Sequence, residues 1–110
     1  MFKFVALWNI RPGVSEADFE RWYKDQHIQD AKCIPGLARY TVNRVASGSA
    51  SGSRYYRMAE LCFASQQDFE KAFVSPEWKH AFVDAQSYIT DHLRLQFDST
   101  EISLQEGRRE

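Results

Sequence analysis

Four short stretches of the chain alternate apolar and polar residues with a period of two, which is typical of β-strands. The first spans residues 2–10 and carries apolar residues at both even and odd positions, so we expect a strand that is covered on both faces. The others span residues 37–45, 54–63 and 92–97. The alternation is clearest in the last of them, where Leu93, Leu95 and Phe97 follow one another at every second position.

Two longer stretches repeat their apolar residues every three or four positions, which predicts amphipathic helices. The first helix begins after Ser15, an N-cap candidate with an acidic residue three positions later. It is expected to run to about residue 27, with a further turn to about residue 33, where a Pro-Gly pair breaks it. The second begins after Ser65 and restarts at Ser75, where serine is the cap and proline the first helical residue.

The predicted order is therefore strand, helix, strand, strand, helix, strand. This is the α+β, ferredoxin-like βαββαβ arrangement, in which the helices lie on one face of an antiparallel four-stranded sheet. The helices can cover only that face, whereas the strands are apolar on both. We therefore expect a second copy of the chain to bury the other face and form a homodimer.

The length of 110 residues suits a single domain with one core. We assign residues 1–100 to that domain and residues 101–110 to a polar C-terminal tail. The glycine- and serine-rich stretch 46–53 lies between two predicted strands, so we interpret it as a flexible hairpin loop.

Charge and cysteine content narrow the classes of partner and compartment. The chain carries 14 basic and 15 acidic residues, and its net charge of −1 argues against binding to nucleic acid or to an anionic membrane surface. The apolar N-terminal stretch is too short to cross a membrane and lacks a signal-peptide layout. Cys33 and Cys62 form no disulfide framework or zinc pattern, so we interpret them as free thiols of a cytoplasmic protein.

The residues that suggest chemistry lie along the first predicted helix. Phe19, Trp22 and Tyr23 share one helical face, and His27 follows Tyr23 by four positions, so its ring lies on that face too. A histidine has an ordinary pKa near 6.5 and can act as a general acid or base at neutral pH. The alternative role of His27 is to cap the C-terminal end of the helix, where a positive charge is favoured.

Other aromatic residues could complete a binding pocket. Tyr23 and Tyr40 could present their hydroxyls to a substrate carbonyl, or could serve as core aromatics. Tyr55 and Tyr56 point to opposite faces of their strand, so only one of the two can face a pocket. The candidate substrate-binding residues are Trp22, Tyr40, Tyr56, Trp78 and Phe82, with His27 and Tyr23 as the catalytic pair.

The remaining histidines do not predict a metal site. His80 and His92 have no partners at a recognised ligand spacing, so we expect no metal and no cofactor. Cys62 lies within a predicted strand and is interpreted as a small buried apolar residue.

Three segments resemble the EthD family, within the dimeric α+β barrel superfamily. They are Phe19-x-x-Trp22-Tyr23-x-x-x-His27, Ile34-Pro35-Gly36-Leu37-x-x-Tyr40 and Ala59-Glu60-Leu61-Cys62-Phe63-Ala64-Ser65. The resemblance covers residues 2–98 and implies a homodimer with a pocket between sheet and helices in each subunit. It also matches His27 to the histidine of the family motif. Relatives by fold include methylmuconolactone isomerase and small cofactor-free monooxygenases, so the resemblance alone does not fix the reaction.

Together these observations favour an isomerase, lyase or cyclase that needs no cofactor. His27 would abstract a proton next to a carbonyl, and tyrosine hydroxyls would stabilise the enolate. The expected substrate is a small anionic or carbonyl-bearing ring compound, such as a lactone or an intermediate of aromatic catabolism or polyketide synthesis. The alternatives are a non-catalytic accessory or small-molecule-binding protein of an oxidative degradation pathway, and a monooxygenase directed at haem or a quinone.

Overall fold

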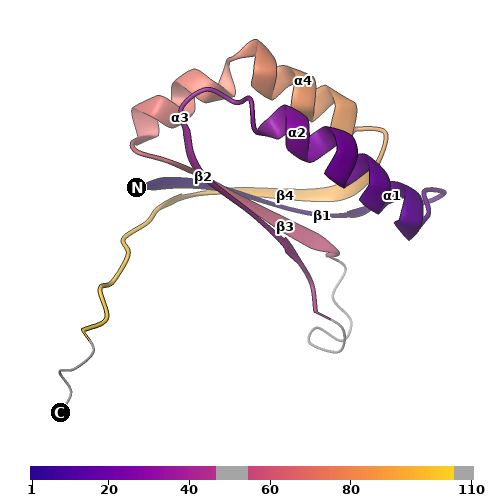
Figure 1. The fold of residues 1–110 in the computed structure, drawn as a ribbon, viewed down its shortest axis with the longest axis horizontal. Coiled ribbons are helices and arrows are strands. Elements are labelled where there is room, and N and C mark those ends of the chain that lie inside the picture. Colours follow the sequence, from indigo (N-terminus) through magenta and orange to yellow (C-terminus); the bar gives the residue numbers. More distant parts are fainter. Residues whose placement is uncertain (47–54, 106–110) are drawn as a thin grey trace.

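The computed structural model describes residues 1–46 and 55–105 as an antiparallel four-stranded sheet with helices on one side (Figure 1). The strands lie in the order β2-β3-β1-β4, which confirms the predicted ferredoxin-like fold. Their bounds are β1 (Phe2–Ile10), β2 (Leu37–Arg44), β3 (Arg57–Phe63) and β4 (Ile89–Asp98). The predicted loop at 46–53 lies outside the described residues except for its first residue. Residues 101–105 of the predicted tail are exposed and form neither helix nor strand.

The first helical segment is continuous but changes its winding in the middle. It consists of α1 (Glu16–Trp22), one turn of π-helix, η1 (Tyr23–His27), and α2 (Ile28–Ala31). The sequence predicted the extent of this segment but not the π-turn. The second segment consists of α3 (Gln66–Phe73) and α4 (Pro76–Ala85), with the predicted break between them. No helix among the described residues has the length and apolar character needed to cross a membrane.

Serine caps set where the helices begin. The side chains of Ser15, Ser65 and Ser75 each accept a hydrogen bond from the backbone N–H three residues later, which confirms the three predicted caps. Ser75 is buried, and its hydroxyl also donates to the Ala72 carbonyl at 2.6 Å. One side chain therefore joins the end of α3 to the start of α4.

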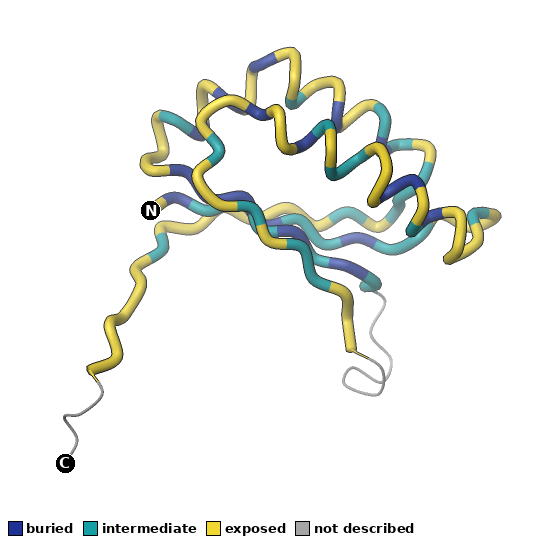
Figure 2. Tube along the Cα trace, viewed as in Figure 1, coloured by how far each residue is buried: buried dark blue, intermediate teal, exposed yellow. Residues whose placement is uncertain are grey.

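The core lies between the helices and the facing side of the sheet. Tyr23, Phe19 and Phe63 are the largest side chains that are fully buried. Figure 2 shows that buried residues are concentrated in the central strands β1 and β3 and recur along the helices, whereas β4 is largely exposed. Phe4 on β1 packs against Phe69 of α3, at 5.6 Å between ring centroids, so even-numbered residues of β1 face the helices.

The opposite side of the sheet carries a second apolar surface. Directly paired residues of an antiparallel sheet share a face. Pairing between β1 and β4 therefore places three couples on this side: Leu7 with Leu93, Val5 with Leu95, and Lys3 with Phe97. The three β4 members are 39%, 41% and 44% exposed, respectively. The predicted two-sided apolar pattern is thus present, and no described helix covers this surface (Figure 1).

We expect Ser75→Ala to lower the free energy of unfolding by about 1–3 kcal/mol, because it removes the cap of α4 and a buried hydrogen bond to α3. Ser65→Ala is the matched control, since Ser65 caps α3 in the same way but is exposed. It should cost about 0.5–1 kcal/mol. Urea denaturation of both variants measures the difference, and equal losses would show that the α3–α4 connection does not depend on Ser75.

Candidate active site

A cavity of about 410 Å³ lies between the helices and the sheet. Ala6 and Ala59 are direct neighbours in the β1–β3 register and form part of its floor. Three alanines from the helical segments also line it, namely Ala31, Ala81 and Ala85. A protein interior is normally packed without gaps of this size. Small side chains on both layers therefore leave the space open.

Six of the seven predicted site residues line this cavity. Trp22 comes from α1, Tyr23 and His27 from η1, and Tyr40 from β2, while α4 contributes Trp78 and Phe82. The fold therefore brings together side chains from four separate elements. Trp8 of β1 also lines the cavity. The sequence did not single it out, because an apolar residue at this position of a strand is interpreted as an ordinary core residue.

Tyr56 does not line the cavity. It lies one residue before β3, and its hydroxyl lies 2.6 Å from Oε2 of Glu20 and 3.1 Å from Oε2 of Glu16. Its ring packs edge-on against Phe19 at the start of the first helical segment. Burial, followed by the hydrogen bond with Glu20, raises the pKa of Tyr56 to about 12. Its expected place among the substrate-binding residues is thus corrected, because β3 begins at Arg57 and Tyr56 turns toward α1.

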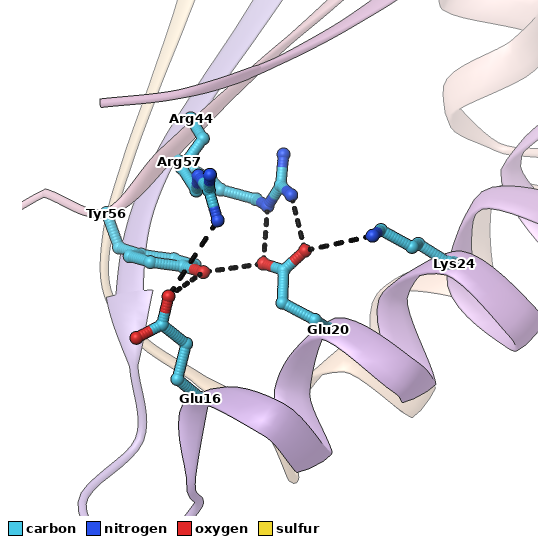
Figure 3. A network of polar contacts seen from close by, with 6 residues as sticks. All are labelled: Glu16, Glu20, Lys24, Arg44, Tyr56 and Arg57. Carbon is cyan, nitrogen blue, oxygen red and sulfur yellow. Dashed lines mark hydrogen bonds and ion pairs between the residues drawn. The ribbon is translucent and has the colours of Figure 1, made fainter. Parts of the chain in front are cut away.

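Glu20 is the centre of a polar network beside the cavity (Figure 3). Its carboxylate accepts two hydrogen bonds from Arg57, at 3.1 Å from Nε and 2.6 Å from the terminal nitrogen. Arg57 is 8% exposed, and its guanidinium carbon lies 4.7 Å from the centroid of the Tyr23 ring. The ion pair therefore fixes a cation against one wall residue of the cavity. Sequence patterns gave no signal for Arg57, since a charged residue at a strand end usually faces solvent.

His27 lies inside the helical segment, not at its end. The helix continues through α2, and the His27 side chain makes no capping hydrogen bond, so the capping role is contradicted. Its ring stacks on Tyr23 at 5.5 Å between centroids and 16° between planes. Burial lowers the pKa of His27 below 6.5, while Asp84 and Asp30 act in the opposite direction. The imidazole is therefore neutral at pH 7.

Three buried polar atoms around the cavity have no hydrogen-bond partner among the described residues. They are Nδ1 of His27, the Tyr23 hydroxyl and the Trp8 indole nitrogen. Burial raises the pKa of Tyr23 above its ordinary value and that of Tyr40 to about 12, although Arg57 lowers both. Both phenols therefore stay protonated at neutral pH and can donate hydrogen bonds. The cavity thus offers a neutral base and several donors in an apolar setting.

The two other histidines make local contacts. His80 Nε2 lies 3.2 Å from Asp30 Oδ2, and His92 Nδ1 lies 2.7 Å from a terminal nitrogen of Arg94. Within residues 1–46 and 55–105, no group of three or more His, Cys, Asp or Glu side chains could hold a metal ion.

The family model described as EthD domain matches residues 11–92. The chain belongs to the EthD family. The matched span contains Tyr23, His27 and Tyr40, whereas Trp8 and Arg94 lie outside it.

Two similar proteins match nearly the whole of this EthD chain. It is 26% identical over 104 residues to an uncharacterized 11.0 kDa protein from the thcB-thcC intergenic region of Rhodococcus erythropolis, with 94% of this chain and 99% of that protein covered. The crystal structure of an EthD family protein from Bacillus halodurans has a TM-score of 0.78 and 25% identity, and the match covers 91% of this chain and 99% of that one.

A third protein shares the fold at lower sequence identity. It is SnoaB, a cofactor-independent oxygenase from Streptomyces nogalater, with a TM-score of 0.66 and 17% identity. The match covers 92% of this chain and 94% of that one. At this identity the likeness establishes the shared fold alone.

The Glu20–Arg57 pair predicts a pH dependence of stability. Hydrogen bonds from Arg57 hold the pKa of Glu20 below its ordinary value of 4.5, although burial opposes them. This contribution is therefore fully present above about pH 4.5 and is lost as the pH falls through the lowered folded-state pKa. We expect Glu20→Gln to reduce the free energy of unfolding at pH 7 by about 1–3 kcal/mol and to flatten its acid dependence.

Glu16→Gln is the matched control, because the Glu16 side chain is exposed and its ion pair with Arg44 is long, at 3.8 Å between Oε2 and a terminal nitrogen. It should change stability by less than about 1 kcal/mol. Chemical denaturation at pH 7 and pH 3 measures both variants. An unaltered acid profile in Glu20→Gln would contradict the role assigned to the buried pair.

Proposed function

We propose that this protein is a cofactor-free isomerase, lyase or cyclase that moves a proton on a small carbonyl-bearing ring compound. The observation that carries the proposal is the unpaired Nδ1 of neutral His27 in a cavity that the protonated hydroxyls of Tyr23 and Tyr40 also line. A buried polar atom without a partner costs about 1–3 kcal/mol. A ligand that supplies the missing hydrogen-bond partner would offset this cost.

The volume and the aromatic lining of the cavity support a small ring compound as the ligand. A volume of about 410 Å³ lies within the usual range for small-molecule sites. Trp22 stacks on Tyr88 at 4.2 Å, and its indole N–H donates to Asp84 at 2.8 Å, so this part of the wall is held rigidly. Lactones and intermediates of aromatic catabolism or polyketide synthesis are the substrate classes that fit this setting and the family resemblance.

The proposed mechanism begins with proton abstraction by His27. Its neutral imidazole takes a proton from the carbon next to the substrate carbonyl, and the carbonyl oxygen becomes an enolate. The protonated hydroxyl of Tyr23 or Tyr40 donates a hydrogen bond to that oxygen. Asp84 and Asp30, which raise the pKa of His27, favour the imidazolium that forms. The imidazolium then returns the proton to another carbon in an isomerase, or to a leaving group in a lyase.

We expect His27→Gln to slow proton exchange by about 10²- to 10⁴-fold, the usual share of general acid–base catalysis. The assay follows exchange of the acidic C–H of unsaturated γ-lactones and cyclic diketones with D₂O by proton NMR. The wild-type rate should fall as the pH drops below 6.5, because the base must be neutral and burial lowers its pKa. This fall of the exchange rate at low pH should be absent in His27→Gln.

His80→Gln is the matched control for His27→Gln. His80 also lies on a helix but is exposed and paired with Asp30. The exchange rate of the His80→Gln variant should therefore equal that of the wild type. An unchanged rate in His27→Gln would remove His27 from the mechanism. Wild-type protein that binds these rings without catalysing exchange would favour the alternative, a non-catalytic small-molecule-binding protein.

We also propose that the protein works as a homodimer joined through the sheet face that the helices leave uncovered. In β4 the polar residues Arg94 and Gln96 share the helix-facing side with Ala6 and Phe4, whereas the large apolar residues point away. This is the reverse of an ordinary two-layer protein, in which the apolar side of a strand faces the helices. A second copy on the outer side would give β4 an apolar neighbour, and a stable interface should bury more than about 1,000 Å².

We expect Leu95→Glu to convert the dimer into monomers, because it places a charge in the middle of that face. Val83→Glu is the matched control, since Val83 is 58% exposed on α4, on the other side of the molecule. Sedimentation at micromolar concentration should show a dimer for the wild type and for Val83→Glu. A wild-type monomer would contradict the proposed interface.

A further inference from the structure

Arg94 lines the cavity, and the mechanism proposed above gives it no role. It lies on β4 opposite Ala6 in the register, so its side chain rises from the edge of the alanine floor. Its guanidinium carbon lies 4.5 Å from the centroid of the Phe82 ring, which is itself part of the cavity wall. The charged group is therefore held at a defined position on the cavity rim.

The partners of Arg94 are all uncharged. One terminal nitrogen lies 2.7 Å from His92 Nδ1, which must accept this hydrogen bond because a guanidinium can only donate. Burial, followed by the charges of Arg94 and Arg11, lowers the pKa of His92, so this partner is neutral at pH 7. Partial enclosure lowers the pKa of Arg94 itself, and no acidic group in the described part of the chain acts in the opposite direction.

Several other arginines of the chain form an ion pair with a carboxylate, which Arg94 lacks among the described residues. Arg21, Arg44 and Arg57 each form an ion pair with a carboxylate. Among the described residues, Arg94, Arg11 and Arg39 form none, and of these three Arg94 alone lines the cavity. A guanidinium presents five N–H donors in a flat fork that matches a carboxylate. Most of these donors stay available on a cation that stands beside an apolar cavity.

We propose that Arg94 binds the carboxylate of the ligand, so that the site selects monoanionic ring acids over neutral rings of the same shape. This inference rests on the cavity being the ligand site of the proposed function. The ring would lie over Ala6 and Ala59, with its acidic carbon toward His27 and its carboxylate toward the rim. One guanidinium matches one carboxylate, and the hydroxyl of Tyr23 and the indole N–H of Trp8 are uncharged donors of the wall.

Lys79 is the competing explanation, because it is a second cation that lines the cavity. Lys79 and Arg94 are both exposed, but among the described residues no aromatic ring of the wall holds the Lys79 ammonium, whereas Phe82 contacts the Arg94 guanidinium. An ammonium on a flexible stem binds an anion less specifically than a positioned guanidinium. The two residues therefore serve as each other's controls.

The test compares 2-naphthoate with 2-naphthamide, which have the same ring and size but differ in charge, by isothermal titration calorimetry. We expect the wild type to bind 2-naphthoate about tenfold more tightly or better, the scale of a charge-assisted hydrogen bond at a half-open site. Arg94→Gln should abolish this preference and leave the affinity for 2-naphthamide within about twofold. Arg94→Lys should keep part of the preference, and Lys79→Gln should keep nearly all of it.

Three results would overturn the inference. They are equal binding of both probes by the wild type, loss of the preference in Lys79→Gln but not in Arg94→Gln, and no binding of either probe at millimolar concentration. Equal binding together with His27-dependent proton exchange would reject the role of Arg94 and leave the proposed function intact. A preference that depends on Arg94 in a protein without exchange activity would reject the enzyme and keep the acid-binding site.

Discussion

Large aromatic side chains hold the two layers of this protein apart, and the other features of the site depend on that spacing. At one end Phe4 contacts Phe69 and Trp78, and at the other Trp8 contacts Tyr23, with ring centroids 4.9 to 5.7 Å apart. Between these two groups the central strands β1 and β3 present the paired alanines Ala6 and Ala59. The helices cannot close onto the alanines without losing the aromatic contacts at both ends, so the gap persists as a cavity.

The same arrangement explains the electrostatic character of the site. Side chains that line a gap in an aromatic core lose water without gaining new partners, which is why His27 is neutral and the tyrosines stay protonated. Charged residues are kept at the margins. Arg57 is neutralised by Glu20 behind Tyr23, and Arg94 stands at the rim with uncharged neighbours. The interior therefore suits the apolar part of a ligand, and the rim suits a charge.

Much of this could be predicted from the sequence, because local periodicity reports which face a residue occupies. The shared face of Tyr23 and His27, the serine caps and the order of strands all follow from local rules. Periodicity cannot report where packing is incomplete, so Trp8 was interpreted as a core residue. At β4 the alternation separates two faces but does not tell which of them meets the helices, and it is the polar side, with Arg94, that faces the cavity. Tyr56 was misplaced because β3 begins at Arg57, three residues later than the predicted strand, and Tyr56 therefore lies outside it.

The π-turn at Tyr23–His27 makes the length of the first helical segment a property of the site. A π-turn is an α-helix with one extra residue accommodated in its winding. The π-turn absorbs that residue, so α1 and α2 keep the relative orientation of a regular helix without it. Winding the same residues as a regular α-helix would instead rotate α1 by about 100° relative to α2. Trp22, whose ring centroid lies 4.9 Å from that of His27, would then leave the face that it shares with His27. When related chains are aligned, the number of residues between Phe19 and Ala31 is thus as informative as their identity.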